Sequence, residues 1–272
     1  MTAVIPIVED LLQTEVIVPW LQFMAQMYPL ITVDQRQAVD RTIDSVLNSS
    51  GKVFFLDAPE GTEKIFLIYL MLAQARSAGK LSLAVESSVI AATLLSEGRI
   101  AHFTFKLPLC VFSGEDYTCP LRKNGPLGKI LQDTAFIVWD KCTMSHRAHI
   151  EAIIRTLKDL RLNQELMVGT TFVFAGGLRQ TLPVIQRGTR ADIIHACLRS
   201  SFLRYYEESH RLRTNMRAHL CGGSTEFPTQ LLEIGSSTMK NKNGFITIDQ
   251  FIGKLVKTVD DLISKVHPDI EN

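Results

Sequence analysis

The sequence lacks the paired cysteines of a disulfide scaffold or of a cysteine-based zinc site. Its five cysteines contain no C-x-x-C pair, and an odd number cannot pair completely within one chain. This pattern favours a reduced, intracellular protein. Cys142, His146 and His149 leave a metal site as an alternative. We do not adopt it, because the helical pattern around both histidines predicts that they lie on the surface.

The sequence also lacks an excess of either charge. Its 29 basic and 28 acidic residues give a net charge of +1, so bulk charge does not predict nucleic-acid binding. Any such binding would have to use a local groove. The hydrophobic fraction of 46% is ordinary for a globular protein and is sufficient for a sizeable core.

Neither a signal peptide nor a membrane-spanning segment is apparent, so we expect no membrane partner. The amino terminus has no basic start followed by a small-residue cleavage site. Residues 16–33 carry no charge, but they include two prolines and two glutamines, whereas a spanning helix needs about 20 mostly apolar residues. We interpret residues 1–30 as a remnant of an upstream domain or a segment covered by a partner.

The stretch Val53–Phe66 predicts a phosphate-binding loop. An apolar strand passes through a Pro/Gly turn into an apolar helix, which is the frame in which backbone N–H groups and a helix N-terminus face an anion. The signature of such a loop is G-x-x-x-x-G-K-[ST]. With Lys64 as its lysine, the chain reads APEGTEKI, which lacks both signature glycines and the hydroxyl residue.

Strand-like and helical patterns alternate along the chain, which predicts an α/β fold with a parallel sheet covered by helices. A capping box at Thr32 predicts a helix to about Asn48. Lys64, Asp140 and Gln180 each follow a predicted strand, and ligands of such sheets bind at the carboxyl ends of the strands. The predicted strands are Val53–Leu56, Leu81–Val85, Ile100–Phe105, Ala135–Trp139, Thr170–Ala175 and Phe202–Tyr206.

Further patterns predict the remaining segments. Ile150, Ile153, Ile154 and Leu157 fall on one face of a predicted amphipathic helix and should be core. The segment Leu107–Pro126 is rich in Pro, Gly, Cys and polar residues and is interpreted as a surface loop. Other helices are expected at Ile65–Ala75, Ser87–Leu95, Leu127–Gln132, Ser145–Leu160, Ala191–Leu198, Pro228–Ile234 and Phe251–Val266.

The strings around these positions resemble the PIF-type (petite integration frequency) DNA helicases, and the Helitron-transposon branch in particular. They include VFFLDAPEGTEKIF, AFIVWDKCTM, FAGGLRQTLPVI, RGTRADIIHACLRSSFL and LRTNMRAHL, and the resemblance covers roughly residues 31–237. It implies a RecA-like P-loop NTPase domain in an ATP-driven 5′-to-3′ DNA helicase with two motor domains. It further implies single-stranded DNA as partner, roles in DNA repair and recombination, and a nuclear location.

The family's nucleotide-binding residues carry over one at a time. By resemblance, Gln35 reads adenine, Gly61 and Thr62 belong to the phosphate loop, and Lys64 contacts the β- and γ-phosphates of ATP. Asp140 matches the acid that holds Mg²⁺ through water. Gln180 matches the glutamine that senses the γ-phosphate, and Arg217 matches an arginine that reaches ATP from across the cleft. Segments that contact single-stranded DNA in the family contain Ser87, Ser88 and His102.

Departures from the family pattern fall on the chemistry. The family's loop is G-P-G-G-T-G-K-T, and Ala58, Glu60, Glu63 and Ile65 replace four of its eight residues. Glu63 would place a negative charge beside an anion, and two such charges about 4 Å apart near a surface repel by roughly 4 kcal/mol. Lys141 replaces the glutamate that activates water, and a charged lysine cannot accept a proton.

Two functions from different classes are therefore expected. The first is an ATP-dependent DNA helicase with impaired hydrolysis, whose first RecA-like domain covers residues 31–217. Residues 218–272 would then be the start of an incomplete second domain with a divergent helical tail. The second is a non-catalytic DNA- or protein-binding relic of a transposon helicase, and a pseudogene product without function is a third possibility.

Overall fold

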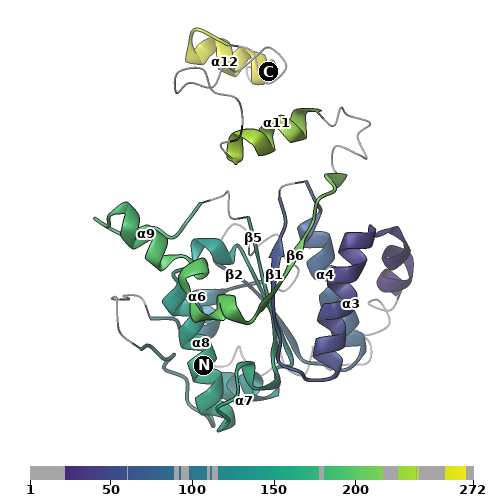
Figure 1. Ribbon diagram of the computed structural model, residues 1–272, viewed down its shortest axis with the longest axis vertical. Helices are drawn as coiled ribbons and strands as arrows, with labels where there is room; N and C mark the ends of the chain where they lie inside the picture. Colours follow the sequence, from purple (N-terminus) through teal and green to yellow (C-terminus); the bar gives the residue numbers. More distant parts are fainter. Residues whose placement is uncertain are drawn as a thin grey trace. The chain divides into compact units, whose positions relative to one another are not determined.

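The computed structural model describes residues 22–59, 61–88, 92, 98–108, 111, 116–177, 181–216, 226–236, 238 and 255–267 (Figure 1). The chain divides into two compact units, residues 1–217 and 218–272.

The first unit is built on a six-stranded parallel sheet with the order β3-β2-β4-β5-β1-β6. This confirms the predicted α/β fold with a parallel sheet. The central strands are buried on both faces, as expected for continuous apolar runs. The strands are β1 (Val53–Asp57), β2 (Ser82–Glu86), β3 (Arg99–Ile100), β4 (Phe136–Asp140), β5 (Thr171–Gly176) and β6 (Glu207–Arg211).

Helices cover both faces of this sheet (Figure 1). Because successive strand residues point to opposite faces, Phe54 packs with helices α3 and α4, whereas Phe55 packs with α6, α7 and α8. Two apolar cores result, one on each face. The helices are α3 (Val33–Leu47), α4 (Lys64–Ser77), α6 (Ala101–Phe105), α7 (Pro126–Asp133), α8 (Arg147–Arg161) and α9 (Arg190–Ala196).

The capping box predicted at the start of α3 is confirmed. The Gln35 backbone N–H donates to Thr32 Oγ1 at 3.4 Å, and the Thr32 N–H donates to Gln35 Oε1 at 3.0 Å. The predicted core face of α8 is also confirmed, since its isoleucines and Leu157 are buried. Local sequence therefore sets where α3 begins and which face α8 buries.

Two predicted strands are wrong. Within Ile100–Phe105, only Ile100 continues a strand, and α6 follows because Ala101 and Phe105, four residues apart, bury one helical face. Phe202–Tyr205 is a 3₁₀ helix with Leu203 buried, and the edge strand β6 comes after it. The remaining 3₁₀ helices are η1 (Tyr28–Leu30), η2 (Cys142–Met144), η3 (Met167–Gly169) and η4 (Leu198–Ser200), and Phe202–Tyr205 is η5.

The interpretation of Leu107–Pro126 as a surface loop is wrong for two of its residues. Leu107 and Cys119 belong to the core beneath α8. The Cys119 backbone N–H donates to Thr156 Oγ1 at 2.8 Å, which satisfies a polar group that burial would otherwise leave unpaired. The loop is therefore anchored to the domain at two points.

The second unit contains helices α11 (Glu226–Gly235) and α12 (Val259–Val266). The predicted helix over Phe251–Val266 is shorter in the structure, since residues 255–258 are not helical and Thr258 caps α12 by accepting the Asp261 N–H at 3.1 Å. Among the described residues of both units, no helix is long and apolar enough to span a membrane.

Candidate nucleotide site at the carboxyl ends of the strands

Lys64 and Asp140 meet at the carboxyl edge of the sheet. Lys64 is the first residue of α4, directly after the loop from β1, and Asp140 is the last residue of β4. Their side chains form an ion pair and are only 11% and 1% exposed. A lysine at the start of a loop helix, paired with an acid from a neighbouring strand, is an arrangement suited to holding phosphate and a divalent cation.

A third charged group, Glu86, lies beside this pair and was missed by the sequence reasoning. It ends β2 and is the register partner of Asp140 on β4, so both side chains leave the same face of the sheet. Glu86 is fully buried. The predicted strand Leu81–Val85 ends one residue before Glu86. An acid directly after an apolar strand indicates a candidate site residue at the carboxyl edge of the sheet, so the sequence did contain a signal for it.

The carboxyl groups of Glu86 and Asp140, here called the carboxylate pair, retain unused bonding capacity. Outside the pair itself, neither oxygen of Glu86 nor Asp140 Oδ2 has a hydrogen-bond partner among the residues that the structure describes, and a hydrogen bond between the two carboxyl groups contributes to the raised pKa of Glu86. Burial, followed by the neighbouring charge of Asp140, raises the pKa of Glu86 to about 8 despite the opposing effect of Lys64. At neutral pH, Glu86 is thus largely protonated unless a cation compensates its charge.

The loop before Lys64 shows the strain of its missing glycine. Glu63 adopts the left-handed conformation at φ 55°, which suits glycine and costs other residues about 1–2 kcal/mol. Gly61 also has a positive φ of 84°. A Cβ added to Gly61 would lie 2.5 Å from Asn215 Oδ1, so the loop packs directly against the segment that follows β6. Asn215 was not among the predicted site residues.

Gln35 and Thr62 are joined to each other. Gln35 is buried, and its Nε2 donates to the Thr62 carbonyl at 3.1 Å while its Oε1 accepts from Thr32. Thr62 Oγ1 donates to the Pro59 carbonyl at 2.7 Å. Gln35 therefore connects the start of α3 to the loop, which places it next to the predicted nucleotide site.

The residues fit a magnesium ion in part. The unpartnered oxygens of the carboxylate pair are the hard ligands that Mg²⁺ prefers. Ile65 offers no hydroxyl at the next position of α4, and the Thr62 hydroxyl is already bonded. Lys141 follows Asp140 in the left-handed conformation at φ 52°, and its backbone N–H donates to Asp140 Oδ1 at 2.7 Å.

Ser87 and Ser88, predicted to contact DNA, lie at the same edge just after β2. The Ser87 hydroxyl accepts the Trp139 Nε1–H at 2.9 Å and exchanges a hydrogen bond with Ser145 Oγ at 2.8 Å. The Ser88 carbonyl accepts the Ala92 N–H at 3.0 Å. Ser87 therefore ties β2 to β4, and Ser88 is half-buried beside it.

His102, also predicted to contact DNA, lies in a cluster of three histidines, and its contact with DNA stays a prediction. Its ring meets that of His149 edge-on at a centroid distance of 4.8 Å, and His146 lies 6.0 Å from His149. The prediction that His146 and His149 are surface residues is wrong for His149, which is buried. His149 Nε2 donates to the Pro108 carbonyl at 3.0 Å.

Burial lowers the pKa of His149 to about 4, and the neighbouring rings of His102 and His146 act in the same direction. Cys142, the third residue of the alternative metal site, is also buried. Among the described residues, no group of three His, Cys, Asp or Glu side chains could hold a metal ion. Gln180 and Arg217 fall outside the described residues, so their predicted roles remain predictions.

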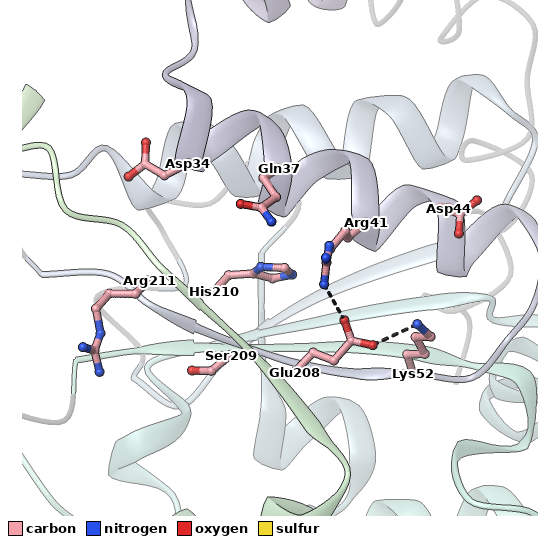
Figure 2. A pocket seen from close by; sticks show the side chains of 9 residues that line it. All are labelled: Asp34, Gln37, Arg41, Asp44, Lys52, Glu208, Ser209, His210 and Arg211. Atoms are coloured by element: carbon pink, nitrogen blue, oxygen red, sulfur yellow. Dashed lines mark hydrogen bonds and ion pairs between the residues drawn. The ribbon is translucent and has the colours of Figure 1, made fainter.

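A second polar region is the α3–β6 groove, a hollow of about 680 Å³ between helix α3 and strand β6 (Figure 2). Glu208 accepts from Lys52 at 2.8 Å and from Arg41 at 3.4 Å. Three acids and three permanent bases line it, so their charges balance and do not favour a polyanion. Its lining residues are Asp34, Gln37, Arg41, Asp44, Lys52, Glu208, Ser209, His210 and Arg211.

The family of the chain follows from a comparison with known protein families. The family model described as PIF1-like helicase matches residues 30–245, most of the chain. The chain belongs to the PIF1-like helicase family. Among curated proteins, none matches it.

Solved structures agree with this membership at the level of fold. A Pif1 structure described in connection with unwinding of forked duplex DNA by two coordinating helicases aligns with a TM-score of 0.63 and 16% identity, over 79% of this chain and 52% of its own. Bacteroides Pif1 bound to single-stranded DNA gives 0.62 and 17%, over 76% and 46%.

Bacteroides Pif1 in complex with ADP-AlF4 gives a TM-score of 0.60 at 17% identity, over 77% of this chain and 47% of its own. The predicted RecA-like fold class is confirmed by these likenesses. The chain spans about half the length of the helicases it matches, so the activity of a whole helicase is not established for it.

Proposed function

We propose that this chain is the ATP-binding first motor domain of a DNA helicase of the Helitron branch, translocating 5′ to 3′ on single-stranded DNA in the nucleus. The buried ion pair between Lys64 and Asp140, positioned by the loop between β1 and α4, is the observation that carries this proposal. It stands in a member of the PIF1-like helicase family.

The residues have distinct roles in this proposal. Lys64 would exchange Asp140 for the β- and γ-phosphates when ATP enters the loop. Asp140 would then be free to hold Mg²⁺, whose charge offsets that of the phosphates during transfer. Gln35, whose side-chain amide donates to the Thr62 carbonyl of the loop, would contact adenine, while Gln180 and Arg217 would complete the site around the γ-phosphate.

The same site carries features that weaken hydrolysis. Glu63 adds a negative charge one residue from Lys64, and Ile65 supplies no hydroxyl for the metal. Lys141 occupies the position where the family has a water-activating glutamate, according to the resemblance. Phosphoryl transfer needs a phosphate cradle, a metal and an oriented water together. We therefore expect nucleotide binding to survive better than turnover.

The test is a titration of the purified chain with a fluorescent ATP analogue in Mg²⁺, alongside Lys64→Ala. Saturable binding that is lost in the variant supports the proposal, and DNA-stimulated hydrolysis would extend it to catalysis. The restoring triple variant Glu63→Gly, Ile65→Thr, Lys141→Glu should increase hydrolysis. Absence of nucleotide binding and of hydrolysis in both wild type and the restored protein would contradict the proposal.

A second candidate is a binding module that retains the helicase fold without catalysis. The observation that favours it is Lys141, whose ammonium cannot serve as the base of the reaction. This module would shift single-stranded DNA in a gel without ATP and would lose affinity steeply with salt. No shift at low salt would remove the DNA-binding version.

A further inference from the structure

The carboxylate pair is the strongest unexplained feature of the described chain. Glu86 and Asp140 end neighbouring parallel strands in register, so their carboxyl groups lie side by side. Both residues are fully buried, and apart from the hydrogen bond that the two carboxyl groups can share, three of their four oxygens have no hydrogen-bond partner among the described residues. Buried acids at this density cost folding free energy unless something compensates their charge.

Lys64 supplies only part of that compensation. Its ammonium pairs with Asp140 Oδ1, which leaves Asp140 Oδ2 and both oxygens of Glu86 without an ion-pair partner in the described structure. Strongly bonding oxygens that converge in a water-poor place are the donor set of a hard divalent cation. The strand geometry, rather than a flexible loop, holds them together.

We propose that Glu86 is a metal-binding residue, and that it and Asp140 jointly hold a divalent cation such as Mg²⁺ at the phosphate loop. This deepens the function proposed above and rests on it, because the remaining ligands would be water and the phosphate oxygens of the nucleotide. Mg²⁺ in such sites takes one or two carboxylates and keeps several waters.

This assignment gives the altered site an oxygen ligand, whereas its loop lacks the family's hydroxyl and its β4 end lacks the family's second acid. Ile65 cannot ligate a cation, and Lys141 contributes positive charge where an acid is expected from the resemblance. Glu86 reaches the same place from β2, the strand next to β4. The second acid is thus provided by a neighbouring strand instead of the next residue in sequence.

The test measures binding of Mn²⁺, a paramagnetic ion that accepts the same oxygen ligands, by electron paramagnetic resonance of the free ion. Wild type, Glu86→Gln and Asp140→Asn are compared, with Glu208→Gln as a control for an exposed acid in the α3–β6 groove. We expect Mn²⁺ affinity to fall about tenfold or more in Glu86→Gln and not to change in Glu208→Gln. Glutamine keeps the size of glutamate, and circular dichroism checks that the variant folds.

A thermal shift provides a second readout that does not depend on activity. A cation that binds only the folded chain raises the melting temperature, so Mn²⁺ should stabilise wild type and Glu208→Gln but not Glu86→Gln. Equal Mn²⁺ affinity in wild type and Glu86→Gln would overturn the assignment. Absence of Mn²⁺ binding to wild type, with and without ADP, would also overturn it.

Nucleotide binding measured in EDTA separates this proposal from the proposed function. Metal-free binding of the fluorescent ATP analogue that depends on Lys64, in a chain that binds no Mn²⁺, would overturn the cation assignment and leave the phosphate site intact. Mn²⁺ binding that depends on Glu86, in a chain that binds no nucleotide under any condition, would overturn the helicase proposal and support the cation site.

Discussion

The site at Lys64 and the α3–β6 groove combine similar charges in opposite surroundings. In the first, Lys64 meets Asp140 and Glu86, and both acids are fully buried. In the second, Lys52 and Arg41 meet Glu208, with side chains 51%, 58% and 35% exposed. Every exposed charge of this trio has an opposite partner, whereas the buried acids keep oxygens without one. Burial with incomplete pairing, rather than the number of charges, distinguishes a candidate ligand site from a solvated surface.

The strongest test of this difference between the two regions removes the lysine from each, Lys64 from the buried site and Lys52 from the α3–β6 groove. We expect Lys64→Met to lower the free energy of unfolding by about 3 kcal/mol, because it leaves two buried acids without a cation. The matched variant Lys52→Met should cost less than about 1 kcal/mol, since its partner stays solvated. Urea denaturation in EDTA measures both values. Equal losses would show that burial does not set the cost.

Burial also affects a third region, the cluster of His102, His146 and His149, in which His149 is buried and makes the stability depend on pH. The pKa of His149 is lowered to about 4 by burial, from an ordinary value of 6.5. Between these values the unfolded chain binds more protons, so the free energy of unfolding is highest above pH 6.5 and falls as the pH approaches 4, by roughly 3 kcal/mol.

Unfolding measured from pH 7 to pH 4 should therefore show a slope that decreases in His149→Gln. The exposed residue His195 provides the control, and His195→Gln should keep the slope of the wild type. A slope that does not change in His149→Gln would assign the acid sensitivity to other groups.

A substitution at Glu63 tests whether this residue of the phosphate loop affects only stability or also the affinity for nucleotide. Glu63→Gly should stabilise the fold by roughly 0.5–1 kcal/mol, because glycine tolerates the left-handed conformation. Leu162→Gly, at a left-handed and exposed position after α8, should give a similar gain. Only Glu63→Gly should also tighten the ATP analogue, by about tenfold or more, since it removes a charge beside the phosphates. The same affinity in both variants would contradict the phosphate-loop assignment.

The smallest effect is expected at the exposed end of the comparison. Glu208→Gln removes both ion pairs of the α3–β6 groove and should cost roughly 0.3 kcal/mol at low salt. The difference should disappear at 1 M salt, where exposed charges are screened within about 3 Å. If the free energy of unfolding fell by more than about 2 kcal/mol and the loss persisted in salt, the charges around Glu208 would behave like the buried charges around Lys64.

Much of the fold follows from patterns that are local in sequence. The capping box at Thr32, the apolar runs of β1, β4 and β5, and the core face of α8 each depend on neighbours a few residues apart. Alternating strands and helices then leave few topologies other than a parallel sheet. Segments whose state depends on distant contacts were predicted wrongly, such as Ile100–Phe105, which became α6 because the core offers a place for Phe105.

The sequence by itself determined the α/β class, the strand–loop–helix frame around Lys64 and the resemblance to PIF-type helicases. Tertiary structure alone decided that Glu86 lies beside Asp140, that His149 is buried, and that Asn215 packs against Gly61. Residues 54 and 154 positions apart in the chain cannot be paired from local patterns, because strand order and register are set by packing of the whole sheet. The same packing removes water from the carboxylate pair, and this converts two ordinary acids into a candidate cation site.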